Sequence, residues 1–146
     1  MDIRSIIAPT IHDRISLEEF AEALSDRAPE VEHDVARLRK SPADREITAS
    51  LFRSIHNIKG DAALCKFELG VAVAHPIETL LGRFREGEIL FSAVLAEMIL
   101  LAIDRLELAT EGLLANKSLD NLELATLVQG LDALAPGPAH QLETAC

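Results

Sequence analysis

One imidazole lies outside the apolar pattern of a predicted helix. His56 belongs to the stretch LFRSIHNIKG, residues 51–60. At about 100° per residue, His56 lies roughly 140° from the centre of the helix's apolar stripe, which consists of Ile47, Leu51, Ile55, Ile58, Ala62 and Cys65. Its side chain is therefore predicted to face solvent, with the cation of Lys59 and the missing side chain of Gly60 beside it. A neutral, exposed imidazole nitrogen is suited to nucleophilic chemistry.

A second block of residues makes this pattern more specific. The block is AHPIETLL, residues 74–81, followed by REGE at residues 85–88, and it places His75 and Glu78 one helical turn apart. With H-x-x-K-G at residues 56–60, it resembles histidine-containing phosphotransfer (HPt) domains, and most of all the N-terminal HPt domain of the chemotaxis histidine kinase CheA. The resemblance covers roughly residues 17–114, and the helix that follows also fits.

The resemblance assigns a role to each of these polar residues. His56 is the residue that is phosphorylated, and Glu78 accepts a hydrogen bond from its Nδ1, which leaves Nε2 for the phosphoryl group. Lys59 neutralises charge on the phosphoryl oxygens, and His75 completes the hydrogen-bond network. Gly60 leaves room for a partner's active site. The binding surface for partners is expected on Phe52, Gly60, Ala63 and Leu64.

The resemblance implies a phosphoryl carrier of two-component or chemotaxis-type signalling. Such a carrier takes a phosphoryl group from the catalytic domain of a histidine kinase and passes it to an aspartate of a response-regulator receiver domain. We expect no bound cofactor, because Mg²⁺ and ATP are supplied through the partner domains. The sequence has no nucleotide-binding glycine motif, so the chain is not a kinase by itself. The sequence does not decide between a freestanding carrier and the first domain of a larger kinase.

Two other classes of function stay open on the sequence alone. Four-helix bundles hold di-metal sites through paired Glu-x-x-His motifs, and residues 30–33 supply one such motif. The second is absent, because His75 precedes Glu78, so we predict no metal site. The other alternative is a bundle that binds partners through Phe52, Ala63 and Leu64 without phosphoryl chemistry.

The composition predicts a helical domain with an aliphatic core. The 146 residues are 49% apolar, and the aromatic residues are five Phe, with no Trp or Tyr. Such a core suits packed helices better than a β-sandwich. The net charge of −10 argues against a nucleic-acid surface. No apolar run approaches the roughly 20 residues of a membrane span, so we expect a cytoplasmic protein. Cys65 is predicted to be a buried thiol.

Start and stop signals divide the chain into helices. A capping box at Ser16 predicts the first start, and Pro29 predicts a break and restart, or a kink in one long helix. Ser41 and Pro42 predict the start of a second helix that ends near Cys65. Three further helices are predicted at residues 69–86, 91–114 and 119–134.

These elements predict an all-α fold, an antiparallel up-and-down four-helix bundle with an additional C-terminal helix. Residues 1–134 form the predicted domain, and residues 135–146 a flexible tail or linker. Gly87 closes the third helix, and Pro76 is expected to bend it. Lys66 occupies a position where the resembled family often has glycine, so the turn before the third helix is expected to be built differently.

Overall fold

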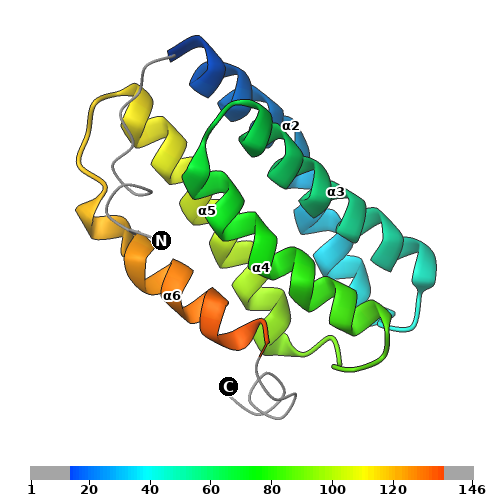
Figure 1. Ribbon diagram of the computed structural model, residues 1–146. Coiled ribbons are helices and arrows are strands. Elements are labelled where there is room, and N and C mark those ends of the chain that lie inside the picture. Colours follow the sequence, from blue (N-terminus) through cyan, green and yellow to red (C-terminus); the bar gives the residue numbers. More distant parts are fainter. Residues whose placement is uncertain (1–13, 137–146) are drawn as a thin grey trace.

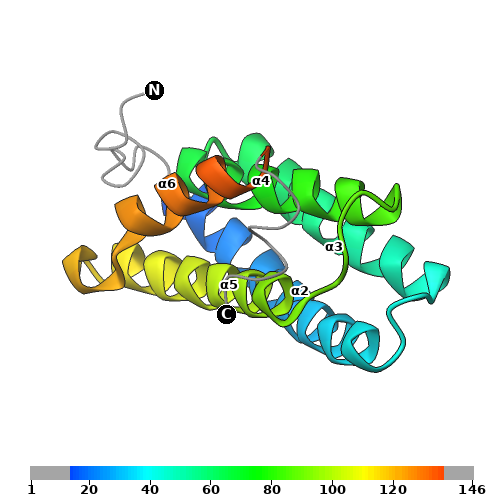
Figure 2. The same cartoon turned by 90° about the horizontal axis from the view of Figure 1, so that it is seen from below.

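Helices make up the regular structure between residues 14 and 136, the part of the chain that the computed structural model describes. Helices α2 to α5 lie side by side, and α6 lies alongside α4 (Figure 1). The view in Figure 2 shows two layers: α3 and α4 lie in the upper part of the picture, and α2 and α5 lie in the lower part. The described helices are α2 (Arg14–Lys40), α3 (Arg45–Leu64), α4 (Glu68–Arg85), α5 (Ala93–Leu114), the short 3-10 helix η1 (Asp120–Leu122) and α6 (Leu124–Leu134).

Helix α2 is continuous through Pro29, so the predicted break is wrong and the alternative of one long helix holds. Proline removes one backbone donor, but the buried positions keep their helical spacing across it, from Leu24 and Ala28 to Val31 and Val35. Burying these side chains outweighs the lost hydrogen bond. The helix already includes Arg14, so Ser16 lies inside it and the predicted capping box is also wrong.

Helix α3 begins three residues later than the sequence predicted. Its cap is Asp44, whose carboxylate accepts hydrogen bonds from the backbone N–H groups of Glu46 and Ile47, at 3.0 and 3.1 Å. The predicted cap, Ser41, belongs instead to the end of α2, because its N–H donates to the carbonyl of Arg37. A side-chain acceptor at the N-cap satisfies donors that the helix itself leaves unpaired.

The turn between α3 and α4 has the hydrogen bonds of a Schellman motif. The N–H of Phe67 donates to the carbonyl of Ala62, and Lys66 donates to Ala63. Lys66 therefore adopts a left-handed conformation with φ of 58°, in the place that glycine usually fills. Cys65 is the C-cap residue and is only partly buried, so the predicted buried thiol is correct only in part.

Gly87 ends α4 with the same pattern and has the conformation that the sequence predicted. Its φ is 80°, and Glu88 donates to the carbonyl of Arg83. Pro76 lies within α4 and is buried, and the helix continues on both sides of it.

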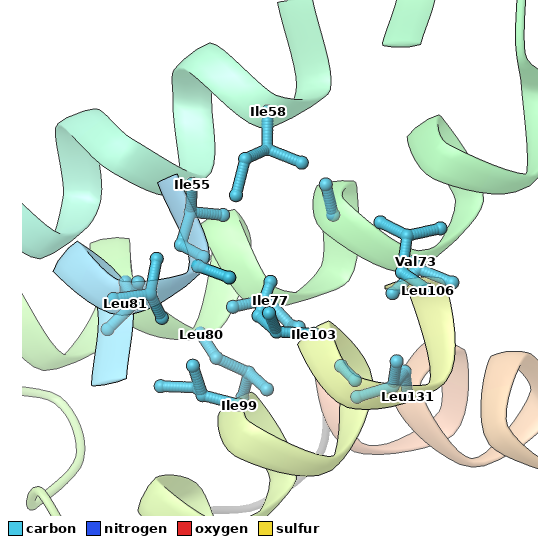
Figure 3. Packing of buried hydrophobic residues seen from close by; sticks show 14 of the residues in the cluster. Ile55, Ile58, Val73, Ile77, Leu80, Leu81, Ile99, Ile103, Leu106 and Leu131 are labelled. Carbon is cyan, nitrogen blue, oxygen red and sulfur yellow. The ribbon is translucent and has the colours of Figure 1, made fainter. Parts of the chain in front are cut away.

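The predicted apolar stripe of α3 faces the core. Its members Ile47, Leu51, Ile55, Ile58 and Ala62 are all buried. Figure 3 shows Ile55 and Ile58 meeting aliphatic side chains of α4 and α5. At one end the two backbones approach closely, because a Cβ on Gly70 would lie 2.6 Å from that of Ala62. This packing fixes which face of α3 remains outside.

The C-terminal region differs from the prediction mainly at the start of its helix. Leu119 precedes the 3-10 turn, and α6 begins only at Leu124. Ala135, the first residue of the predicted tail, is buried, and its carbonyl accepts a hydrogen bond from Arg83 at 3.0 Å. Most of that predicted tail, residues 137–146, lies outside the described residues. Within residues 14–136, no helix has the length and hydropathy needed to cross a bilayer.

Candidate functional site

His56 lies on the outward face of α3, as its position relative to the apolar stripe predicted. Its side chain is 59% exposed, although its neighbour Ile55 is fully buried. The helix therefore presents the imidazole to solvent from a backbone that the core holds in place.

Glu78 approaches His56 from the neighbouring helix α4. The side chain is 15% exposed, and the preceding residue Ile77 and Leu81, one turn later, are buried in the core. One carboxylate oxygen, Oε2, lies 2.6 Å from Nδ1 of His56, and the other, Oε1, accepts a hydrogen bond from Nζ of Lys59 at 2.6 Å. One carboxylate thus links the imidazole to a cation.

The charge of Glu78 determines which imidazole nitrogen carries the proton. Burial by itself raises the pKa of Glu78, but the hydrogen bonds and charges of Lys59 and His56 outweigh it and hold the pKa below its usual value. The carboxylate is therefore ionised at neutral pH and only accepts hydrogen bonds. Nδ1 of His56 must then be the donor, which leaves the lone pair of the neutral ring on Nε2.

Lys59 has a partner that the sequence did not predict. The ammonium, expected to act on phosphoryl oxygens, is bound to Glu78, and its side chain is 24% exposed. It therefore offsets the negative charge of the carboxylate beside His56.

The four residues predicted to bind partners share the outer side of α3 but differ in exposure. Gly60, Ala63 and Leu64 are exposed, and Leu64 retains 84% of its accessible surface. A Cβ on Gly60 would have no neighbour within 4 Å, so packing does not explain this glycine. Phe52 is partly buried against the core.

His75 is not part of the hydrogen-bonded network in the described region. It is exposed, and its backbone carbonyl, not its ring, accepts a hydrogen bond from Thr79. Residues 74 and 76 on either side are buried, whereas His75 itself faces solvent. Residues 14–136 also contain no group of three or more His, Cys, Asp or Glu side chains placed to hold a metal ion. The Glu-x-x-His motif at residues 30–33 is therefore not part of such a group.

Sequence reasoning missed an aromatic and cationic stack next to His56. The rings of Phe52 and His56 are parallel to within 7°, with centroids 6.4 Å apart. The guanidinium carbon of Arg85 lies 4.4 Å from the centre of the Phe52 ring. The spacing of four residues between Phe52 and His56 predicts the ring pair. No sequence signal connects Arg85, on a different helix, to them.

Comparison with known proteins identifies the chain's relatives. The family model described as Hpt domain matches residues 16–135. Among curated proteins, the chain is 26% identical to the sensor histidine kinase CheAY of Helicobacter pylori, and the match covers 60% of the present chain. It is 27% identical to the chemotaxis protein CheA of Rhizobium meliloti over 85% of its length, and 30% identical to that of Cereibacter sphaeroides over 63%.

These relatives are much longer than the present chain. The matched regions span 11%, 16% and 13% of their respective lengths. No solved structure matches the chain significantly. Because the family model covers most of the sequence, including the helices that carry His56 and Glu78, the chain belongs to the Hpt domain family.

Proposed function

We propose that this domain is a phosphoryl carrier in histidine kinase signalling, with His56 as the residue that is phosphorylated. The observation that carries this proposal is the hydrogen bond between Nδ1 of His56 and Glu78. It fixes one tautomer of an exposed imidazole and leaves the nucleophilic lone pair on Nε2, across the ring from the carboxylate.

The transfer proceeds in line at phosphorus. The lone pair of Nε2 forms the P–N bond as the bond to the donor's leaving oxygen breaks. The ring keeps its Nδ1 proton and gains positive charge, which the carboxylate of Glu78 stabilises at 2.6 Å. In the second transfer an aspartate oxygen attacks phosphorus, the P–N bond breaks, and the electron pair returns to Nε2.

The partners follow from this chemistry. We infer that a histidine kinase catalytic domain donates the phosphoryl group and that the aspartate of a receiver domain accepts it. Both approach the outer side of α3, where Gly60 leaves open space above the helix. ATP and Mg²⁺ are brought by these partners, and the domain binds no cofactor of its own. His75 is exposed on α4, where its side chain is available to contact a bound partner.

The scaffold for this site is inferred to be an antiparallel up-and-down bundle with α6 packed on its side. Contacts between α3 and α4 occur in opposite order along the two helices: Ala62 lies near Gly70, and Lys59 bonds to Glu78. The same holds for α2 and α3, where Arg27 pairs with Asp61 and Asp34 accepts a hydrogen bond from Ser50.

The test is transfer of labelled phosphate from a phosphorylated histidine kinase to the chain. Wild type is expected to gain a label that is stable in alkali and lost in acid, as a phosphoramidate is. The His56→Gln variant is expected to gain none. A matched control is His33→Gln, which alters another exposed histidine, on α2. Equal labelling of wild type and His56→Gln would refute the assignment, and an acid-stable label would exclude phosphohistidine.

A further inference from the structure

The surface beside His56 contains a stack that the phosphotransfer chemistry does not require. Phe52 lies one helical turn before His56 on α3, and the two rings are nearly parallel, with a 7° angle and centroids 6.4 Å apart. Arg85, the last residue of α4, covers the Phe52 ring at 4.4 Å. The stack therefore joins the end of α4 to the imidazole through one aromatic ring.

Packing restricts where the Phe52 ring lies. The side chain is partly buried against the core. A Cβ on Gly82 would lie 4.0 Å from its Cε2, so the ring borders the part of α4 that has no side chain. Gly82 and Arg85 follow Glu78 by four and seven residues, which places all three on one strip of α4. The strip that holds Nδ1 of His56 through Glu78 thus also holds Phe52 through Arg85.

An exposed imidazole held by a single hydrogen bond remains free to turn about that bond. Within residues 14–136, the bond between Nδ1 and Glu78 is the polar contact that holds the His56 side chain. A parallel ring alongside it restricts the plane of the imidazole, and a cation over the face of that ring restricts the ring in turn.

We propose that Phe52 is a positioning residue for His56 and that Arg85 positions Phe52, so that Nε2 is presented in one orientation. The proposal rests on the proposed function for its importance, but the orientation of the ring can be measured without any transfer. It gives Phe52 a role within the domain in addition to its predicted place on the partner-binding surface.

The first measurement is nitrogen NMR of the His56 ring in the unphosphorylated chain, at an alkaline pH above which the ring signals no longer change. Wild type is expected to show mainly the form protonated on Nδ1. Phe52→Leu keeps an apolar side chain but removes the ring. The imidazole is then expected to turn away from Glu78 part of the time, which gives a more even mixture of tautomers. Phe52→Tyr keeps an aromatic ring at this position and should therefore give the wild-type spectrum. A spectrum unchanged in Phe52→Leu overturns the proposal.

The second measurement is the rate of phosphorylation by phosphoramidate. Nε2 of His56 attacks the phosphorus of this small donor, the donor's own P–N bond breaks, and its protonated amino group leaves as ammonia. The reaction needs no partner-binding surface. Phe52→Leu is expected to be about 2–10-fold slower than wild type, and Arg85→Gln about 2–5-fold slower. If Phe52 serves only to bind partners, these rates will equal that of wild type and only transfer from the kinase will slow, which overturns the proposal.

Matched variants control for general effects on stability and charge. Phe84→Leu alters another partly buried phenylalanine, whose ring lies against Phe91 and not His56. Arg53→Gln removes an exposed arginine next to Phe52 in sequence. Both are expected to keep the wild-type tautomer and rate, and slowing equal to that of Phe52→Leu would contradict a specific role for the stack. If wild type accepts no phosphate from any donor, the proposed function fails, while the NMR result still decides the positioning.

Discussion

Two partly buried glutamates on different helix pairs have opposite electrostatic environments. Glu78, on α4 facing α3, is bonded to Lys59 and His56, and its pKa is lowered. Glu107, on α5, has its pKa raised, first by burial and then by the negative charges of Glu32, Glu111 and Asp104. Burial acts in the same direction on both groups, so the partners make the difference.

The comparison separates a carboxylate used in a site from one that the fold merely accommodates. The ionised form of Glu78 is stabilised by two donors, and that form is the one that orients His56. The ionised form of Glu107 is disfavoured by every charge that shifts its pKa. Partial burial of a carboxylate therefore does not indicate function by itself, whereas pairing with an imidazole and an ammonium does.

The largest effect is expected from Glu78→Gln. The amide has nearly the same shape but carries no charge, so it no longer stabilises the positive charge that develops on the phosphorylated ring. A hydrogen bond to a charged group contributes about 1.5–3 kcal/mol, which corresponds to phosphorylation slower by about 10–100-fold. The rate of labelling by kinase or phosphoramidate measures this.

Glu107→Gln is the matched control for that rate. It removes the same charge from a glutamate on another helix, and labelling is expected to remain at the wild-type rate. Equal slowing in both variants would show that net charge, not the bond to His56, controls the reaction.

The second effect is on stability in acid. The folded-state pKa of Glu78 lies below its ordinary value of 4.5. Its ionisation therefore stabilises the fold fully above that value, and the contribution is lost as the pH falls through the folded pKa. The difference in free energy of unfolding between wild type and Glu78→Gln, about 1 kcal/mol at pH 7, should shrink below pH 4.5 in urea titrations. A difference that grows in acid would contradict the direction of the shift.

The sequence predicted features of this site that depend on one helix better than contacts that form between two helices. The outward position of His56 followed from the 3.6-residue period of α3 alone, and the pairing with Glu78 followed from the resemblance. The bond between Lys59 and Glu78 and the stack of Arg85 on Phe52 were missed, because they depend on how α4 is rotated against α3. The predicted network role of His75 stays a prediction, since its ring makes no hydrogen bond among the contacts of residues 14–136.

The fold shows the same limit. The apolar period predicted the helices and their buried faces, but it did not locate their starts. Ser41 and Asp44 are both good caps, and only the hydrogen bonds of the folded turn distinguish them. Pro29 predicted a break because the gain from burying Ala28 and Val31 on either side of it is a tertiary effect.

The third effect concerns the open space at Gly60, one helical turn after His56 on α3. Gly60→Ala adds a Cβ that meets no atom of the described structure, so it should stabilise α3 by about 0.5–1 kcal/mol. Transfer to a receiver domain should nevertheless slow, because the methyl group lies on the surface that we propose the partner approaches. Thermal unfolding and receiver phosphorylation measure the two changes.

Gly130→Ala is the matched control for Gly60→Ala. A Cβ on Gly130, in α6, also has no neighbour within 4 Å. The same gain in stability without slower transfer is expected. If Gly60→Ala also leaves transfer unchanged, Gly60 has no role in partner approach.

The smallest effect is the change in the free energy of unfolding that we expect from Glu107→Gln. Because the folded-state pKa of Glu107 is raised above 4.5, its ionisation opposes folding, and the wild type loses stability as the pH rises through that range. Removing the charge relieves repulsion by Asp104 and Glu111, which lie three and four residues away on the same helix, and should stabilise the fold by about 0.5 kcal/mol at pH 7. The gain should vanish below pH 4.5, where both forms are neutral. A variant less stable than wild type at pH 7 would mean that Glu107 makes favourable contacts that outweigh the repulsion, and the contrast with Glu78 would then fail.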